Sequence, residues 1–101
     1  MSEDITGIVF DYSKKVNNNR NTRSIFTHLV SEVQELEDEI IKIENGEEEG
    51  ADGIAGESVD IMLCALDLIH HYNPHLTPEE VNRIAIKKCE KWLSKYKDTV
   101  Y

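Results

Sequence analysis

Apolar residues recur every three or four positions in four stretches of the chain, a spacing that places them on one face of a helix. These stretches run from Asp4 to Val16, from Thr22 to Gly46, from about Gly56 to Tyr72, and from Thr77 to about Lys97. No alternating strand pattern competes with them. The sequence therefore predicts an all-α fold resembling a four-helix bundle, in a single domain that spans residues 1–101.

Turn-forming residues separate the four predicted helices. The asparagine-rich segment 17–21 favours a turn, Gly46 is suited to end the second helix, and the acidic, glycine-rich segment 47–56 predicts a loop. Thr77 and Glu80 have the spacing of a capping box, which marks the start of the fourth helix.

The third predicted helix is apolar around nearly its whole circumference, with only a narrow polar strip. Such a helix must be covered on nearly all sides, which three partner helices in one small chain struggle to achieve. We therefore expect a homodimer at least, with this helix near its centre. The fourth helix is expected to contribute five residues to the core: Val81, Ile84, Ala85, Trp92 and Leu93.

The chain is acidic, and its charges are unevenly distributed. A net charge of −9 argues against nonspecific binding to nucleic acid. Residues 32–60 hold twelve acidic side chains and one lysine, whereas residues 77–101 hold six basic and four acidic side chains. This division suits a site that holds a cation together with an anionic ligand, and it equally suits an ordinary solvated surface.

No segment has the character of a leader or a membrane span. The N-terminus lacks a basic start followed by a long apolar core, and the longest apolar run, 61–66, is far too short to cross a bilayer. Cys64 and Cys89 lie in apolar helical patterns and are expected to be small buried thiols. The expected location is the cytoplasm, with no membrane partner.

Two pairs of carboxylates lie beside the apolar stripes, each pair one helical turn apart. Glu32 and Glu35 belong to the second helix, and Glu57 and Asp60 repeat the spacing on the third. Antiparallel packing of these helices would let all four converge. Converging carboxylates repel one another and resist ionisation, a conflict that Mg²⁺, with its preference for oxygen ligands, would remove. Glutamates at this spacing are also common on solvated helices, so one pair alone predicts little.

The two acidic pairs and their spacing resemble the signature of the MazG-type all-α nucleoside triphosphate pyrophosphohydrolases, EExxE followed after a spacer by ExxD. Glu32 and Glu35 match the last two glutamates of the first motif, and Glu57 and Asp60 match the second. Ser31 departs from the pattern, because it stands where the family has its first glutamate. The similarity covers roughly residues 25–97 and includes the basic last helix.

This resemblance implies hydrolysis of a nucleoside triphosphate to the monophosphate and pyrophosphate, with Mg²⁺ or Mn²⁺ as the cofactor, in a homodimer or a dimer of dimers. Glu32, Glu35, Glu57 and Asp60 would bind the metal, and Glu32 or Glu35 would orient or deprotonate the attacking water. Three lysines spaced along the last helix are candidates for holding the triphosphate, with a solvated basic face as the alternative: Lys88, Lys91 and Lys95.

Three other functions remain open. Phosphoribosyl-ATP pyrophosphohydrolase is a comparable small all-α enzyme with similar acidic motifs. A ferritin-like di-iron protein requires Glu-x-x-His on two helices, and this chain offers only Asp67-x-x-His70, once. A non-catalytic helical interaction module predicts that Mg²⁺ neither binds nor stabilises the fold.

Overall fold

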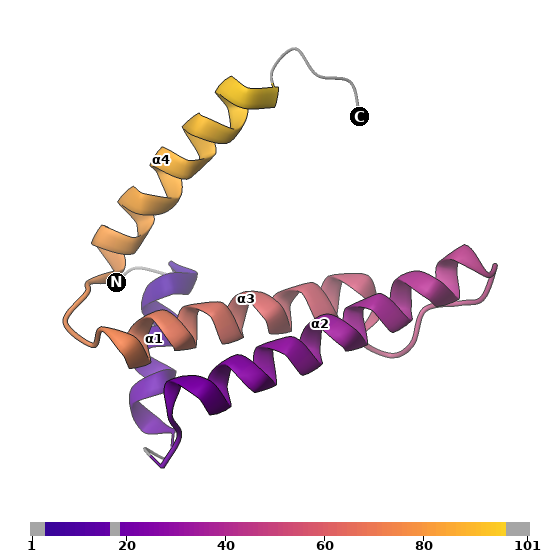
Figure 1. The fold of residues 1–101 in the computed structure, drawn as a ribbon, viewed down its shortest axis with the longest axis horizontal. Helices are drawn as coiled ribbons and strands as arrows, with labels where there is room; N and C mark the ends of the chain where they lie inside the picture. Colours follow the sequence, from indigo (N-terminus) through magenta and orange to yellow (C-terminus); the bar gives the residue numbers. More distant parts are fainter. Residues whose placement is uncertain (1–3, 17–18, 97–101) are drawn as a thin grey trace.

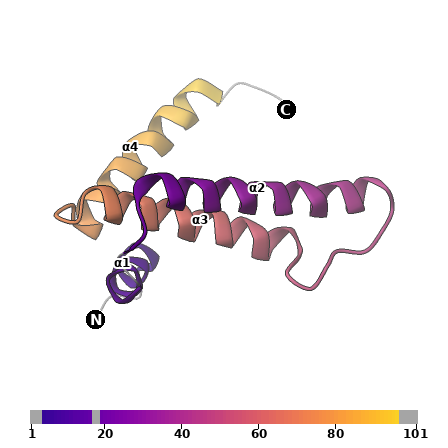
Figure 2. The ribbon, with the colours of Figure 1, turned by 60° about the horizontal axis from the view of Figure 1, so that its bottom comes forward.

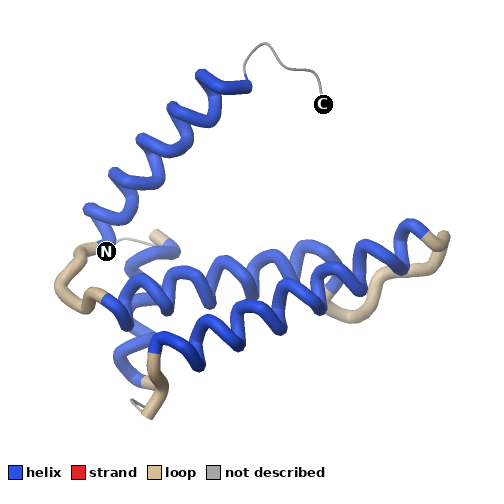
Figure 3. The backbone as a smooth tube through the Cα atoms, viewed as in Figure 1, coloured by secondary structure: helices blue, strands red, loops and turns tan. Residues whose placement is uncertain are grey.

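The computed structural model describes residues 4–16 and 19–96, which form four helices and no strand. Helix α1 spans Ile5–Lys15, α2 Thr22–Glu44, α3 Gly53–Tyr72 and α4 Pro78–Tyr96 (Figure 1, Figure 3). The prediction of an all-α chain with four helices is confirmed for this part of the molecule. The helix boundaries agree closely with the sequence pattern except at α3, which begins one turn before the predicted start.

Helices α2 and α3 form a long antiparallel hairpin, seen side by side in Figure 2. Asn21 starts α2 through a reciprocal pair of contacts: its side chain accepts from the Ser24 amide at 2.8 Å, and the Ser24 hydroxyl oxygen accepts from the Asn21 amide at 2.9 Å. Gly46 ends α2 with φ 77°, a conformation that suits glycine because it has no Cβ.

Helix α1 crosses α3 near the C-terminal end of α3. Phe10 is buried there, and its ring lies 4.9 Å from that of His70. Asp67 accepts a hydrogen bond from the Ser13 hydroxyl at 2.6 Å and forms an ion pair with Arg20. An apolar contact and a charged network therefore fix α1 against the hairpin.

Helix α4 is attached to α1 and does not contact α2 or α3. Its first turn carries the predicted capping box, in which the Glu80 amide donates to Thr77 Oγ1 at 3.2 Å. Asn82 then holds α1, accepting from the Thr6 hydroxyl at 2.9 Å and donating to Asp4 Oδ2 at 2.7 Å. Beyond this anchor the helix projects away from the hairpin (Figure 1).

The apolar core within one chain is small. Among the described residues only five apolar side chains are buried: Val9, Phe10, Ile25, Cys64 and Val81. Of the predicted core of α4, Val81 is buried, but Ile84, Trp92 and Leu93 are 47%, 60% and 68% exposed, and Ala85 is exposed. That part of the prediction is wrong for the single chain, because α1 is the only other described helix that α4 contacts, and it packs near the start of α4.

The loose packing is also visible in the dimensions of the chain. Its radius of gyration is 16.0 Å, whereas a compact domain of this length has about 13 Å. Cys89, predicted to be buried, is exposed on α4, while Cys64 on α3 is buried as predicted. None of the helices in the described ranges combines the length and the apolar character that crossing a membrane requires.

Candidate carboxylate centre

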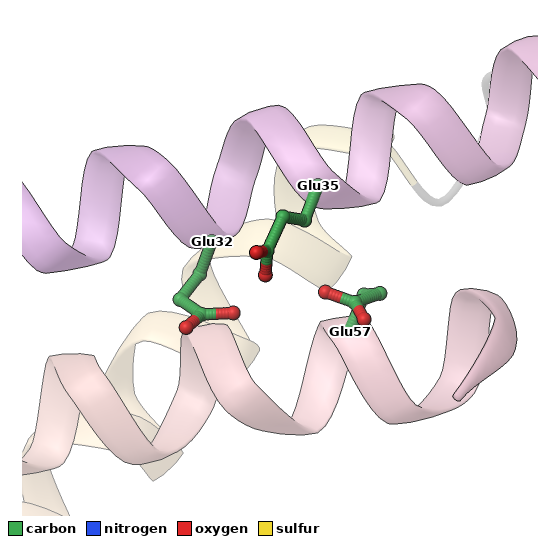
Figure 4. A group of neighbouring side chains, drawn as sticks. All are labelled: Glu32, Glu35 and Glu57. Carbon is green, nitrogen blue, oxygen red and sulfur yellow. The ribbon is translucent and has the colours of Figure 1, made fainter. Parts of the chain in front are cut away.

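The α2–α3 hairpin brings acidic side chains from both helices to one place near the middle of α2. Glu32 and Glu35 project from α2, and Glu57 projects from α3 toward them (Figure 4). Each offers one carboxylate oxygen, and the three oxygens lie within 4.8 Å of one another. The convergence expected from the spacing therefore holds for these three residues.

The fourth predicted ligand, Asp60, belongs to an overlapping group. Asp60, Glu57 and Asp52 each offer an oxygen, and these oxygens also lie within 4.8 Å of one another. Glu57 is thus common to both groups. Asp52 was not predicted, because the segment that contains it was assigned to a loop, whereas the residue directly precedes the first turn of α3.

Glu57 is the most constrained of these carboxylates. Its side chain sits at the inner face of α3, the residue is only 8% exposed, and Oε2 receives no hydrogen bond from any described residue. Burial, followed by the charge of Glu35, raises the pKa of Glu57 to about 7. The ionised form is therefore disfavoured at this position unless positive charge is brought to it.

The pKa of Glu32 is also raised, although one contact favours its ionised form. Hydrogen bonding with the Glu35 carboxyl group raises the pKa of Glu32, and burial and the charge of Glu35 act in the same direction. His28 Nε2 lies 2.9 Å from Glu32 Oε1 and forms an ion pair with it when protonated. The other oxygen, Oε2, is buried and has no donor among the described residues.

The residues present fit a hard divalent cation. Two buried carboxylate oxygens from opposite helices, Glu32 Oε2 and Glu57 Oε2, lack a hydrogen-bond donor in the described part of the chain. All the donor atoms of the two groups are carboxylate oxygens, the type that Mg²⁺ and Mn²⁺ prefer. A cation between the helices would satisfy these atoms and lower the pKa of both glutamates.

Glu39 lies one turn after Glu35 on α2, but it binds the following loop instead of joining the carboxylate centre. It is buried, and it accepts a hydrogen bond from Lys42 at 2.9 Å and from the Gly50 amide at 2.6 Å. A Cβ on Gly50 would lie 3.0 Å from Glu39 Oε2, so the absence of a side chain at position 50 allows this close approach. Glu39 therefore holds the loop that leads to Asp52 and α3.

Two further polar residues of the hairpin, Asp67 and Ser31, are also separate from the centre. Asp67 is turned to α1, where Ser13 and Arg20 occupy its oxygens. Ser31, at the position that departs from the MazG signature, is exposed and donates its hydroxyl to the His28 carbonyl at 2.7 Å.

The three candidate phosphate-binding lysines do not join the centre within one chain. Lys88, Lys91 and Lys95 are exposed on the projecting part of α4, a helix that makes no contact with either helix of the hairpin. Lys95 Nζ lies 5.2 Å from the centroid of the Tyr96 ring, a cation–π contact on α4 itself. A single chain therefore presents the carboxylates without the lysines.

Comparison of the chain with protein-family models, with curated proteins and with solved structures finds no match.

Proposed function

We propose that the chain is a metal-dependent nucleoside triphosphate pyrophosphohydrolase of the MazG type, which acts as a homo-oligomer. The observation that carries the proposal is the buried Glu57, whose pKa is raised to about 7 and which faces Glu32 and Glu35 from the opposite helix. Perturbed carboxylates that converge in this way are typical of functional sites. The two-motif signature read from the sequence falls on the same residues.

Glu32, Glu35, Glu57 and Asp60 would hold Mg²⁺ or Mn²⁺, with Asp52 as an additional acidic neighbour. When bound, the ion would supply positive charge that stabilises the triphosphate oxygens during the reaction. The oxygen of a water molecule forms a new bond to phosphorus as the bond between the nucleoside monophosphate and the pyrophosphate leaving group breaks. Glu32 or Glu35 would accept the proton that the water loses.

The fold supports the assignment of metal binding and proton acceptance to these carboxylates. The ligands sit on two long helices, which hold side chains more rigidly than loops do. Glu39 fixes the loop before α3 through the Gly50 amide and so helps to set where α3 begins. Phosphoryl transfer depends mainly on positioning and charge stabilisation, so the reaction requires no serine or cysteine nucleophile.

The proposal is tested by pyrophosphate release from a panel of canonical and modified nucleoside triphosphates in the presence of Mg²⁺. At least one substrate should be cleaved, and Glu35→Gln and Asp60→Asn should each lower the rate by at least about two orders of magnitude. Glu37→Gln, which changes an exposed glutamate on the same helix, is the matched control and should retain the wild-type rate.

Full activity in both site variants would refute the assignment of these residues. Phosphoribosyl-ATP belongs in the same panel, because cleavage of that substrate alone would identify the related pyrophosphohydrolase. Absence of turnover together with no effect of Mg²⁺ on the thermal midpoint would indicate a non-catalytic helical module.

A further inference from the structure

We propose that α4 is an arm that docks on a second copy of the chain, so that its lysines reach the carboxylate centre of that copy rather than their own. The role of the lysines toward a triphosphate rests on the function proposed above. The docking of the arm does not, because it is argued from packing and charge alone.

The first argument is the amphipathic character of α4. At about 100° per residue, seven residues fall within an arc of roughly 140° on one side of the helix; these are Val81, Ala85, Ile86, Cys89, Trp92, Leu93 and Tyr96. Val81, at the edge of this arc, is buried against α1, whereas Trp92 and Leu93 further along it are exposed. The arc is therefore the continuation of a face that is already used for packing.

The second argument is the surface area. The chain exposes 7879 Å², whereas a monomeric protein of 11.6 kDa is expected to expose about 5,800 Å². The excess of roughly 2,000 Å² is more than the approximately 800 Å² that each partner buries in a stable interface of standard size. The single chain thus has enough surplus surface for a dimer, much of it in exposed apolar side chains on all four helices.

The third argument is charge complementarity. Helix α4 carries five basic and three acidic side chains, whereas residues 22–72, which contain the hairpin, carry thirteen acidic and two basic ones. Lys88, Lys91 and Lys95 lie within roughly 80° of one edge of the apolar arc, so they flank the face that would dock. An arm of this kind is attracted to the acidic hairpin of a second copy and is oriented by it.

The surface that would receive the arm is an apolar groove between α1 and the hairpin. The groove has a volume of about 490 Å³, and its apolar walls include Ile8, Tyr12 and Val16 from the α1 segment and Val59 and Leu63 from α3. It adjoins the carboxylate centre, because His28 lines the groove and pairs with Glu32. Trp92 and Leu93 seated here would bring the lysine edge of the arm toward the acidic side of the hairpin.

This arrangement makes each site composite. One copy supplies the four carboxylates, and the other supplies the lysines, which its own fold keeps away from its own centre. Carboxylates and lysines would then hold the metal and the triphosphate from opposite sides of the interface. An isolated chain would retain a cation site but lack its anion-binding side chains.

The docking is tested on the intact chain without reference to activity. Copies with natural and heavy nitrogen isotopes are mixed under conditions of subunit exchange and treated with a carbodiimide, which joins lysines directly to nearby carboxylates. Linked peptides between α4 and the α2–α3 hairpin should contain one light and one heavy partner. Links formed only within single copies, or a chain that sediments as a monomer at micromolar concentration, would overturn the proposal and leave the groove to another ligand.

Variants keep the test independent of cross-linking chemistry. Trp92→Asp combined with Leu93→Asp should convert the dimer to a monomer, whereas Ser94→Asp, on the opposite side of the helix, should leave the dimer intact. All three positions are exposed in the single chain, so folding of that chain does not depend on them. A double variant that remains fully dimeric would contradict the docking of this face.

Complementation separates the docking from the catalytic role. A copy with Asp60→Asn is co-expressed with a copy in which Lys88, Lys91 and Lys95 are changed to alanine, each being inactive alone. Composite sites predict recovery of about a quarter of the wild-type activity, because half of the randomly paired dimers are mixed and each has one complete site. If the co-expressed copies recover no activity, the composite site is refuted. If cross-links join light and heavy copies but the wild type is inactive, only the proposed pyrophosphohydrolase activity is refuted.

Discussion

Replacing Glu57 with glutamine tests whether a divalent ion holds the two helices of the hairpin together at the carboxylate centre. Glu57 is common to both acidic groups and is almost fully buried. Glutamine has nearly the same shape but carries no charge and gives up no proton when a metal binds. The variant therefore removes the electrostatic conflict of the centre and one of its metal ligands at the same time.

The size of the effect follows from the pKa of Glu57. Because this pKa is about 7, close to half of the chains hold a protonated Glu57 at pH 7. A metal binds the ionised carboxylate, so Mg²⁺ should release about half a proton from this residue at pH 7 and nearly a whole one at pH 6. Glu32, whose pKa is also raised, adds to the release in the same direction.

Isothermal titration calorimetry with Mg²⁺ in two buffers of different ionisation enthalpy measures this release directly. For the wild type, the number of protons released on Mg²⁺ binding should decline toward pH 8.5. Below pH 7, its apparent affinity for Mg²⁺ should rise by up to about tenfold for each pH unit. Glu57→Gln should bind more weakly and lose the Glu57 share of the release. Wild-type affinity and proton release in the variant would refute the metal assignment.

Glu57 also predicts a pH dependence of thermal stability in the absence of metal. The pKa of Glu57 is higher in the folded chain than its ordinary value of 4.5, so folding favours the protonated form. Its contribution to stability is complete below pH 4.5 and is lost as the pH rises through 7. In EDTA the wild-type melting midpoint should therefore fall across this range relative to Glu57→Gln. A variant less stable than the wild type at pH 8 without metal would contradict the burial argument.

Three further changes test the parts that support the site. Asp67→Ala should lower the free energy of unfolding by about 1–3 kcal/mol, measured by urea denaturation, because Ser13 and Arg20 lose their acceptor. Burial opposes ionisation of Asp67, but the hydrogen bonds from Arg20 and Ser13 and the charge of Arg20 together outweigh burial and lower the pKa of Asp67. The contribution of Asp67 to stability should therefore be complete above pH 3.8 and disappear as the pH falls below it; equal stability of variant and wild type at pH 7 would refute it. Thr77→Ala removes the cap of α4 and should cost about 1 kcal/mol in the same assay, with no change in Mg²⁺ affinity. Glu39→Gln should speed amide exchange at Gly50 while Glu37→Gln does not, and unchanged exchange in both would show that Glu39 does not hold the loop.

Most of the helical framework is predictable because its determinants are local. The start of α2 at Thr22 and its end before Gly46 follow from turn-forming residues next to an amphipathic stretch. The approach of Glu32 and Glu35 to Glu57 is also predictable, since antiparallel packing of two helices joined by a short loop brings their polar borders together.

The remaining features depend on contacts between distant positions. Asp52 joins the site because α3 begins at Gly53, one turn earlier than the glycine-rich segment suggested. Glu39 resembles Glu35 in sequence, and only the approach of the Gly50 amide distinguishes its task. The exposure of Trp92 was not predictable, because periodicity identifies an apolar face but does not say whether the same chain covers it.

The hydrogen bonds of Asn82 with Asp4 and Thr6 anchor α4 near its first turns, so a small rotation of the helix there produces a large displacement of its far end. From Asn82 to Lys95 the helix rises by roughly 20 Å, so a tilt of about 10° at Asn82 displaces the far end by about 3.5 Å. That displacement exceeds the length of a hydrogen bond. Substitutions at Asp4 or Thr6 can thereby alter where the distal lysines lie without changing any of the four candidate metal ligands.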